Sequence, residues 1–414
     1  MNPKFQPTMF FLYGPPGSGK STFVAENQLE PFTVSPDEIR RMFTVEVSAT
    51  DGGSAPLLSG RVHRRVFQLA EEIAETKAFR GATIVIDAMN INPRSIKPFI
   101  SVAKAHGYRT VGIDFNKNIT LDELIERNLK REPMRRVDQD VLANKKSQAD
   151  RYTTKHLFDK FITPDEFINT ANEMYDIETH EYYDHPVVVV GDIQSEYEPL
   201  RALHEDYPDA RFIYIGDLFD RGPEPLSVAN TVESGIIFGD DIFVMGNHDT
   251  NMTKIIRTDI SANKWVQTWH TRQQLNAGGW NDDRIMRLMD HYTPFHIFKT
   301  HPNGPKWYAT HSGLAARNFD TDPWRTSEWE YTHGVSDRNL AYSGASTYTD
   351  YQEGVMEYSI FGHRGQEAPE STDDNIIYLD NKPNTYCLES RVETGGWLSA
   401  LLLEGNNEPK LVRY

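Results

Sequence analysis

Short apolar runs separated by amphipathic stretches dominate the first third of the chain. Residues 9–13 (MFFLY), 84–86 within ATIVID and 111–115 (VGIDF) are typical of buried strands, because each is brief and almost continuously apolar. Between them, residues 64–76 and 94–105 place apolar side chains at helical spacing. Strands that alternate with helices predict parallel β-α-β units, which bind ligands at the carboxyl ends of their strands.

A different pattern begins near residue 186. Short apolar runs follow one another, and each ends in a polar cluster that contains Asp, Asn or His. The runs lie at residues 187–190, 212–215, 242–245, 306–310, 358–361 and 376–379. This pattern predicts a two-sheet sandwich whose strand ends meet at one metal site.

The change of pattern divides the chain into two predicted domains. A length of 414 residues favours two or three domains. We expect one domain over residues 1–158, a linker over 159–184 that is rich in Glu, Asp, Thr and Tyr, and a second domain over 185–414. The expected fold class is α/β: a parallel sheet flanked by helices, then a β-sandwich with flanking helices.

Composition narrows the class of protein. Hydrophobic residues make up 38% and charged residues 25%, which is typical of globular chains. No apolar run is long enough to cross a membrane, and the N-terminus lacks a cleavage pattern for secretion. Cys387 is the one cysteine, which excludes a disulfide framework and a cysteine-ligated zinc site. We therefore expect a cytoplasmic protein, in a phage-infected bacterium if the gene is viral.

The acidic residues are unevenly placed. The net charge is −17, and almost all of it lies after residue 182. A strong negative field does not favour non-specific wrapping of DNA. The carboxylates of the second half either form a solvated surface or bind metal ions.

The first predicted site is a phosphate loop. Residues 14–22 (GPPGSGKST) directly follow the first strand and match G-x4-G-K-[ST]. The glycines allow backbone N–H groups to surround phosphates, Lys20 reaches the β and γ oxygens, and Ser21 can ligate Mg²⁺. We expect ATP with Mg²⁺ here, bound through Gly14, Gly17, Gly19, Lys20, Ser21 and Thr22.

Polar residues after the second and third strands point to the phosphoryl acceptor. Asp37 could take the proton of an acceptor hydroxyl, or it could cap the helix that starts there. Arg40 could hold an acceptor phosphate with both arms of its guanidinium. Asp87 and Asn90 follow the third strand, where residues that face a ligand belong.

A basic segment follows at residues 126–136 (ERNLKREPMRR). Arg127 and Arg131 are four residues apart, so on a continuous helix they would share one face. They could close over the triphosphate as a mobile lid. The alternative is an exposed basic helix face.

With these motifs, residues 9 to about 151 resemble the 5′-kinase domain of polynucleotide kinases in phage and bacterial nucleic-acid repair. The shared pattern is the P-loop, Asp37-x-x-Arg40, Asp87 with Asn90, and Arg127-Asn-x-x-Arg131, followed by a basic-Val-x-x-x-Val-Leu run. The resemblance implies that Asp37 is the general base and that Arg40 binds the acceptor phosphate. It also implies that Arg131, with Arg127, stabilises the transferring phosphoryl group.

The second predicted site is a two-metal centre. Five clusters each follow an apolar strand: Gly191-Asp-Ile-Gln194, Gly216-Asp-Leu-Phe-Asp-Arg-Gly222, Gly246-Asn-His-Asp249, His311-Ser-Gly-Leu314 and Gly362-His363. Hard divalent ions are bound by carboxylate, amide and imidazole groups, and one Asp can bridge two of them. Any one of these histidines alone is more commonly structural, but the ordered set is not.

This order resembles the calcineurin-like metallophosphatases over residues 185–381. The resemblance implies two divalent ions, Mn²⁺ among the candidates, bound by Asp192, Asp217, Asn247, His311 and His363, with Asp217 as the bridge. It also implies that His248, oriented by Asp220, protonates the leaving group and that Arg221 binds the phosphate.

Gln194 departs from that family pattern, which usually has His at this position. A Gln amide oxygen is a weaker ligand than imidazole and does not titrate near neutral pH. Gln194 therefore binds the first metal directly, through water, or not at all, and phosphodiesterase activity depends on which of these holds.

A 5′-hydroxyl kinase joined to a metallophosphatase resembles the end-healing module of RNA repair. We expect conversion of 5′-OH and 3′-phosphate or 2′,3′-cyclic phosphate ends into ligatable ends, with RNA favoured over DNA. The ligase is expected on another chain. The alternatives are a nucleoside or metabolite kinase fused to a nucleotide or dinucleoside-polyphosphate hydrolase, and a non-catalytic interaction protein.

Overall fold

The chain folds into two units. The structure is a computed structural model, and it describes residues 5–48, 54–57, 62–131, 136–258, 265–314, 318, 321–334, 358–363, 377–378 and 385–414. One unit comprises Gln6–Asn172, and the other comprises Met1–Phe5 with Glu173–Tyr414. No helix within the described ranges is both long and apolar enough to cross a membrane.

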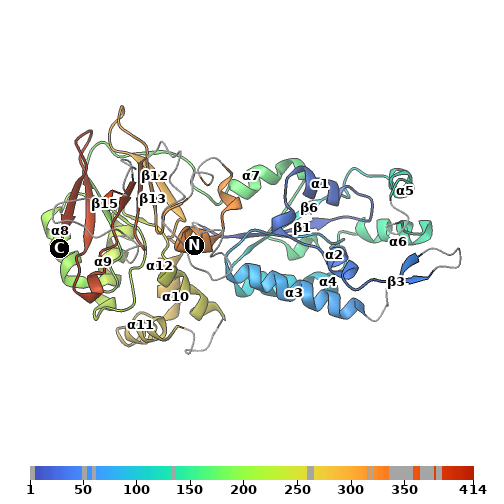
Figure 1. Cartoon of the computed structure of the whole chain (residues 1–414), viewed down its shortest axis with the longest axis horizontal. Helices are drawn as coiled ribbons and strands as arrows, with labels where there is room; N and C mark the ends of the chain where they lie inside the picture. Colours follow the sequence, from blue (N-terminus) through green and yellow to red (C-terminus); the bar gives the residue numbers. More distant parts are fainter. Residues whose placement is uncertain are drawn as a thin grey trace. The chain divides into compact units, whose positions relative to one another are not determined.

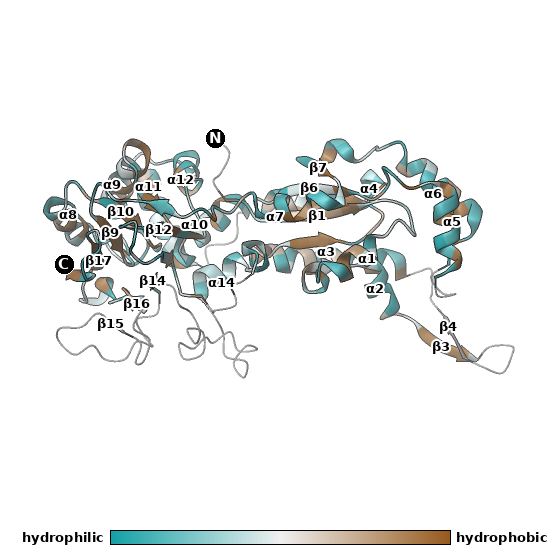
Figure 2. Cartoon of the chain, turned by 90° about the horizontal axis from the view of Figure 1, so that it is seen from above, coloured by the Kyte–Doolittle hydropathy of each residue, from teal (hydrophilic) through white to brown (hydrophobic). Residues whose placement is uncertain are grey.

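The N-terminal unit is built on a parallel sheet with the order β2-β5-β1-β6-β7. Its strands are β1 (Thr8–Tyr13), β2 (Thr33–Val34), β5 (Ile84–Ile86), β6 (Arg109–Asp114) and β7 (Lys160–Ile162). Every residue of β1 is buried because the strand is central and covered on both faces, and its ribbon is coloured hydrophobic in Figure 2. This explains the nearly continuous apolar run in the sequence.

Helices cover both faces of this sheet, as Figure 1 shows. Met9 and Phe11 pack with residues of α3 and α4, whereas Phe10 contacts Phe167 of α7 with ring centroids 5.0 Å apart. A short hairpin, β3 (Val45–Ser48) with β4 (Ser54–Leu57), lies outside the sheet. The helices are α1 (Lys20–Glu26), α2 (Pro36–Arg41), α3 (His63–Phe79), α4 (Pro93–Ala105), α5 (Leu121–Leu129), α6 (Gln139–Ala149) and α7 (Phe167–Asn172).

The segment expected to be a linker begins with structured elements. Strand β7 pairs in parallel with β6, and α7 belongs to the N-terminal unit. Gly112 makes this pairing possible, because a Cβ there would lie 2.4 Å from the ring of Phe161. Further on, β8 (His180–Glu181) pairs with β12 (Phe295–Lys299) of the C-terminal unit. The division between units therefore falls at residues 172 and 173, inside the segment 159–184.

The C-terminal unit contains two sheets, with the orders β11-β10-β9-β17-β18 and β15-β16-β14-β13-β12-β8. Val187 and Val189 of β9 pack against Phe298 and Trp307 of the second sheet, whereas Val188 and Val190 face the helices. The strands are β9 (Val187–Val190), β10 (Arg211–Tyr214), β11 (Ile242–Phe243), β12 (Phe295–Lys299), β13 (Trp307–Thr310), β14 (Tyr358–Phe361), β15 (Ile377–Tyr378), β16 (Thr385–Cys387), β17 (Ser399–Leu403) and β18 (Lys410–Arg413).

The expected α/β fold class, with a parallel sheet followed by a sandwich, is thus confirmed. Ile376 and Leu379, the ends of the last expected strand, lie outside the described residues. The helices of this unit are α8 (Tyr197–Asp206), α9 (Pro225–Phe238), α10 (Asn247–Thr258), α11 (Val266–Ala277), α12 (Asp282–Met289) and α14 (Glu328–His333).

Candidate functional sites

The phosphate loop leaves β1 and enters α1 in the N-terminal unit. Gly14, Gly17 and Gly19 all have positive φ angles of 153°, 83° and 103°, which other residues adopt only with strain. Lys20 Nζ donates to the carbonyl oxygens of Gly14 (2.9 Å) and Pro15 (2.8 Å). Burial lowers the pKa of Lys20 to about 8, against the opposing charges of Asp87 and Asp37. Ser21 and Thr22 lie on the exposed side of α1.

Asp87, Asp37 and Arg131 lie close enough to Lys20 for their charges to interact with its ammonium group. Asp87 follows β5, and burial raises the pKa of its carboxyl group, while the nearby ammonium of Lys20 lowers it. Asp37 on α2 pairs with Arg40 one turn later. The helix cap is Ser35, whose side chain accepts from the backbone N–H of Glu38, so Asp37 is not the cap. Asp37 therefore remains a candidate general base, with Arg40 as its ion-pair partner.

The two arginines of the predicted lid do not share a helix face. α5 ends at Leu129, and Arg131 lies beyond the C-cap residue. The side chain of Asn128 bonds both the carbonyl (2.7 Å) and the N–H (3.0 Å) of Val137, so residue 137 lies beside the end of α5. Arg131 is close enough to Asp37 for their charges to interact, and its Nη1 is buried with no hydrogen-bond partner among the described residues.

Arg127 stays exposed on α5. A Cβ on Gly17 would lie 4.0 Å from the Cβ of Arg127, so the helix runs beside the phosphate loop. Asn90, expected to face a ligand, instead has its amide buried and donating to the carbonyls of Leu12 and Ile86, both at 3.0 Å. Asn90 therefore ties the ends of β1 and β5 together.

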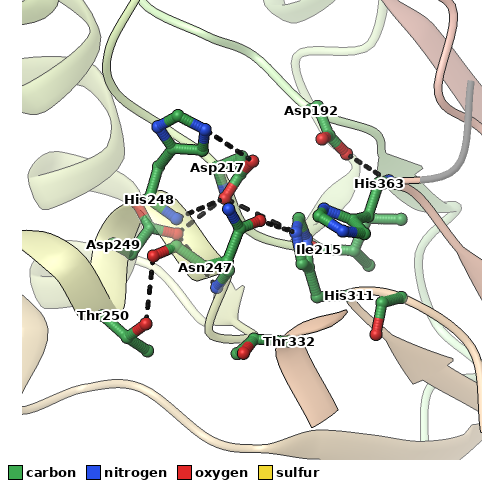
Figure 3. A network of polar contacts seen from close by, with 12 residues as sticks. Asp192, Ile215, Asp217, Asn247, His248, Asp249, Thr250, His311, Thr332 and His363 are labelled. Atoms are coloured by element: carbon green, nitrogen blue, oxygen red, sulfur yellow. Dashed lines mark hydrogen bonds and ion pairs between the residues drawn. The ribbon is translucent and has the colours of Figure 1, made fainter. Parts of the chain in front are cut away.

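The second site lies where strands of both sheets of the C-terminal unit end (Figure 3). Asp217, His311 and His363 each offer a ligand atom within 4.8 Å of the others. His311 Nδ1 donates to the carbonyl of Ile215 at 2.7 Å, which turns its Nε2 toward Asp217 Oδ1 (3.4 Å). That same Nε2 lies 3.0 Å from Asn247 Oδ1. The carboxylate of Asp217, the imidazoles of His311 and His363, and the amide oxygen of Asn247 therefore lie around one position that suits a metal ion.

These side chains can converge because the backbone at two glycines passes very close to the carboxylates. A Cβ on Gly246 would lie 2.3 Å from Asp217 Oδ1, and one on Gly362 would lie 2.1 Å from Asp192 Oδ1. Several non-glycine residues also hold the left-handed conformation, at roughly 1–3 kcal/mol each. They are Gln194, Ser195, Asp217, Asp220, Arg221 and His363. Such strain is concentrated where side chains must converge.

The donor set fits divalent cations. Asp192 is buried, and burial together with the carboxylates of Glu389 and Asp217 raises its pKa. Burial acts in the same direction on Asp217, but the imidazoles of His311, His248 and His363 outweigh it and lower the pKa to about 2. Buried carboxylates this close repel one another, and a bound cation would remove that repulsion. Asp192 Oδ1 accepts from the backbone N–H of His363 at 3.1 Å, which joins the first strand end to the cluster.

Gln194 lies inside this site. Its Nε2 donates to Asp217 Oδ2 at 3.1 Å, and its Oε1 is buried with no hydrogen-bond partner among the described residues. An unpaired buried oxygen at this place suits a cation ligand. Direct ligation through this oxygen would give the first metal one neutral amide ligand in place of a stronger imidazole donor.

His248 lies at the edge of the cluster. Its Nδ1 is 2.7 Å from Asp220 Oδ2, and its Nε2 is 3.3 Å from Arg221 Nη2. Burial alone would lower the pKa of His248, but the charges of Asp217 and Asp220 raise it to about 9. Arg221 also pairs with Glu393 at 2.7 Å. A protonated imidazole beside a guanidinium can receive a phosphate and supply a proton.

Sequence reasoning singled out neither Asp249 as a functional residue nor Glu389. Asp249 accepts from the backbone N–H groups of Gly246 (3.0 Å), Asp217 (2.7 Å) and Leu218 (3.2 Å). It therefore fixes the loop that carries Asp217. Asp249 could have been identified from its position directly after Asn247 and His248. Nothing local in the sequence marks Glu389 as part of the site.

Comparison with known families agrees with this division. Residues 9–153 match the model of an AAA domain, and residues 185–365 match the calcineurin-like phosphoesterase model. The chain thus joins a P-loop kinase-like domain to a calcineurin-like metallophosphoesterase domain. Such domains imply a nucleotide with Mg²⁺ in the first and divalent metal in the second, and together they support an enzyme of phosphoryl transfer and phosphoester hydrolysis.

Two solved structures are similar to part of the chain. One is described as a candidate diadenosine tetraphosphatase, with 18% identity and a TM-score of 0.39 over 57% of this chain and 97% of that one. The other is a metallophosphoesterase from Sphaerobacter thermophilus, with 16% identity and a TM-score of 0.33 over 55% of this chain and 87% of that one. No curated protein gave a significant match.

Proposed function

We propose that this chain is a bifunctional nucleic-acid end-healing enzyme. The N-terminal domain phosphorylates 5′-OH ends with ATP, and the C-terminal domain removes 3′-phosphates. The observation that carries the proposal is the convergence of Lys20, Asp37 and Arg131 at the phosphate loop, with Arg40 beside Asp37. This set of groups suits phosphoryl transfer to a hydroxyl, a reaction that a phosphohydrolase alone does not perform.

In the kinase reaction, Asp37 takes the proton of the 5′-hydroxyl as its oxygen bonds to the γ-phosphorus. The bond from that phosphorus to the β-γ bridging oxygen breaks, and ADP leaves. Lys20 and Arg131 offset the charge on the transferring group. Arg40 holds the phosphate next to the acceptor hydroxyl, which favours a polynucleotide over a free nucleoside.

In the phosphatase reaction, bound divalent ions would supply positive charge and acidify a water molecule. The water gives up a proton to solvent as its oxygen bonds to phosphorus, and the bond from phosphorus to the 3′-oxygen breaks. His248 gives its Nε2 proton to that departing oxygen, and Arg221 holds a phosphate oxygen. The ends produced suit a ligase on a separate chain, and RNA ends are the favoured substrate.

The decisive experiment compares acceptors and substrates. Transfer from labelled ATP is measured to 5′-OH oligoribonucleotides, oligodeoxynucleotides and free nucleosides. Hydrolysis is measured on 3′-phosphate oligonucleotides and on diadenosine tetraphosphate. We expect oligonucleotides to be preferred in both assays. Transfer to nucleosides alone, with hydrolysis of the dinucleotide alone, would favour the metabolite kinase fused to a dinucleoside-polyphosphate hydrolase.

A further inference from the structure

We propose that Thr268 and Thr271 of α11 are positioning residues for the phosphatase reaction. They hold the carboxylate of Asp220, which in turn orients His248 as the proton donor. The inference rests on the phosphatase part of the proposed function. Neither threonine belongs to a motif of the strand ends, and both come from a helix about fifty residues further along the chain.

Both oxygens of Asp220 are engaged. Oδ2 lies 2.7 Å from His248 Nδ1 and accepts from the hydroxyl of Thr268, and Oδ1 accepts from the hydroxyl of Thr271 at 2.6 Å. An ionised carboxylate only accepts, so the imidazole and both hydroxyls are donors. The side chains of Asp220, Thr268 and Thr271 are each at most 4% exposed. Water therefore does not compete for the carboxylate oxygens of Asp220.

The two threonines are suited to this task by their spacing. Three residues apart on α11 (Val266–Ala277), they present hydroxyls one above the other on the same helix face. Threonine hydroxyls in helices commonly donate back to the preceding turn. Thr271 Oγ1 is 3.2 Å from the carbonyl of Gln267 but only 2.6 Å from Asp220, so the carboxylate is the stronger acceptor.

Fixing Asp220 fixes the imidazole. Asp220 sits in a loop with φ of 75°, and the hydroxyls of α11 hold its side chain from outside that loop. With Nδ1 bound to Asp220, Nε2 faces Arg221 at 3.3 Å and Asp217 Oδ2 at 3.9 Å, which is the side where phosphate would bind. An alkoxide such as a ribose 3′-oxygen needs a proton in order to leave, whereas p-nitrophenolate does not.

The test uses the full chain with Mn²⁺ and two monoesters, a 3′-phosphate oligonucleotide and p-nitrophenyl phosphate. Thr268→Val and Thr271→Val each remove a hydroxyl and keep the side-chain shape. We expect kcat on the 3′-phosphate to fall about tenfold or more in each variant, with KM unchanged. On p-nitrophenyl phosphate we expect a change below about twofold, because that leaving group needs no general acid. Serine at either position should restore activity.

A matched control is Thr253→Val on α10, whose hydroxyl donates to the carbonyl of Thr250 at 2.8 Å. Both activities should be unchanged there. Equal losses on both substrates in a folded variant, or no loss on either, would overturn the proposal; alanine variants serve where valine prevents folding. If the parent hydrolyses neither monoester, the phosphatase function itself fails and this inference with it.

Discussion

At the phosphate loop, the side chain of Asp37 is 77% exposed, whereas at the metal cluster the side chains of Asp217 and Asp220 are 2% and 0% exposed. Asp37 pairs with Arg40 on its own helix. Asp220 is held by groups that lie 28 to 51 residues away in the chain. One carboxylate is thus supported locally, and the other is supported by the tertiary structure.

The difference shows two ways to prepare phosphoryl chemistry. In the N-terminal site, Arg131 Nη1 has no hydrogen-bond partner among the described residues, and on our proposal a bound substrate would supply one. In the C-terminal site, buried carboxylates and imidazoles already converge, and a bound cation would relieve the repulsion between the carboxylates. Substitutions should therefore act mainly on rate at the first site, and on both folding and metal binding at the second.

The largest expected effect tests whether the sites are independent. Lys20→Ala or Asp37→Asn should lower kinase activity at least about 10³-fold, because charge neutralisation or the general base is lost. Hydrolysis of a 3′-phosphate should be unaffected in both variants. Asp217→Ala should give the reverse pattern. Loss of both activities in a folded Lys20→Ala protein would contradict two separate sites.

Asp249→Ala should lower both the stability of the protein and its affinity for metal, because Asp249 is part of the buried C-terminal site. It leaves three backbone N–H groups without an acceptor, so we expect a loss of about 3–5 kcal/mol in the free energy of unfolding. The affinity for Mn²⁺ should fall roughly 10- to 100-fold. Denaturant unfolding and metal titration measure these effects. Exposed Asp283 on α12 is the control, and Asp283→Ala should change stability by less than about 0.5 kcal/mol.

Arg131→Lys should lower the kcat of the kinase about 100-fold, because lysine does not reproduce the planar fork of guanidinium. KM for ATP should change little if the contact strengthens in the transition state. Steady-state kinetics provide the measurement, and Arg41→Lys on α2 is a matched control that should behave as the parent. Parent-like kinetics of Arg131→Lys would contradict a role of Arg131 in phosphoryl transfer.

Gln194→His should strengthen the first metal site. In the parent we expect one tight and one weak divalent site, with Mn²⁺ more effective than Mg²⁺, because imidazole ligands favour the softer ion. The substitution should tighten the weak site about tenfold and raise diesterase relative to monoesterase activity. Metal titration with assays on a monoester and a diester tests this. Equal occupancy of both parent sites, with no change in the variant, would identify Gln194 as a full ligand or a bystander.

The smallest expected effect is the uptake of protons when ATP binds at the phosphate loop. The pKa of Lys20 is lowered to about 8 by burial, and a bound triphosphate should raise it. Binding of ATP at pH 8 should therefore take up about half a proton, and binding at pH 6.5 close to none, because Lys20 is then already charged. Calorimetry in buffers of different ionisation enthalpy measures the uptake. Proton release at pH 8 would contradict the assigned direction.

Much of the fold could be predicted because it is local. The apolar runs at residues 84–86, 187–190 and 358–361 coincide with β5, β9 and β14. Polar clusters directly after such strands predicted which residues face the sites, and Asp217, His311 and His363 do converge. Strand β7 was hidden in the expected linker because its three residues have no clear alternation, and its pairing depends on Gly112 of another strand.

The sequence by itself determined the two motif sets, their order and the strand ends that carry them, since these follow from periodicity and short-range spacing. Only the tertiary structure decided that Asn90 and Asn128 bond the backbone, that Asp249 supports Asp217, and that α11 supports Asp220. Those contacts join segments that are distant in the chain or reverse its direction. A local pattern records which side chains are polar, but the packing of elements decides which donor meets which acceptor.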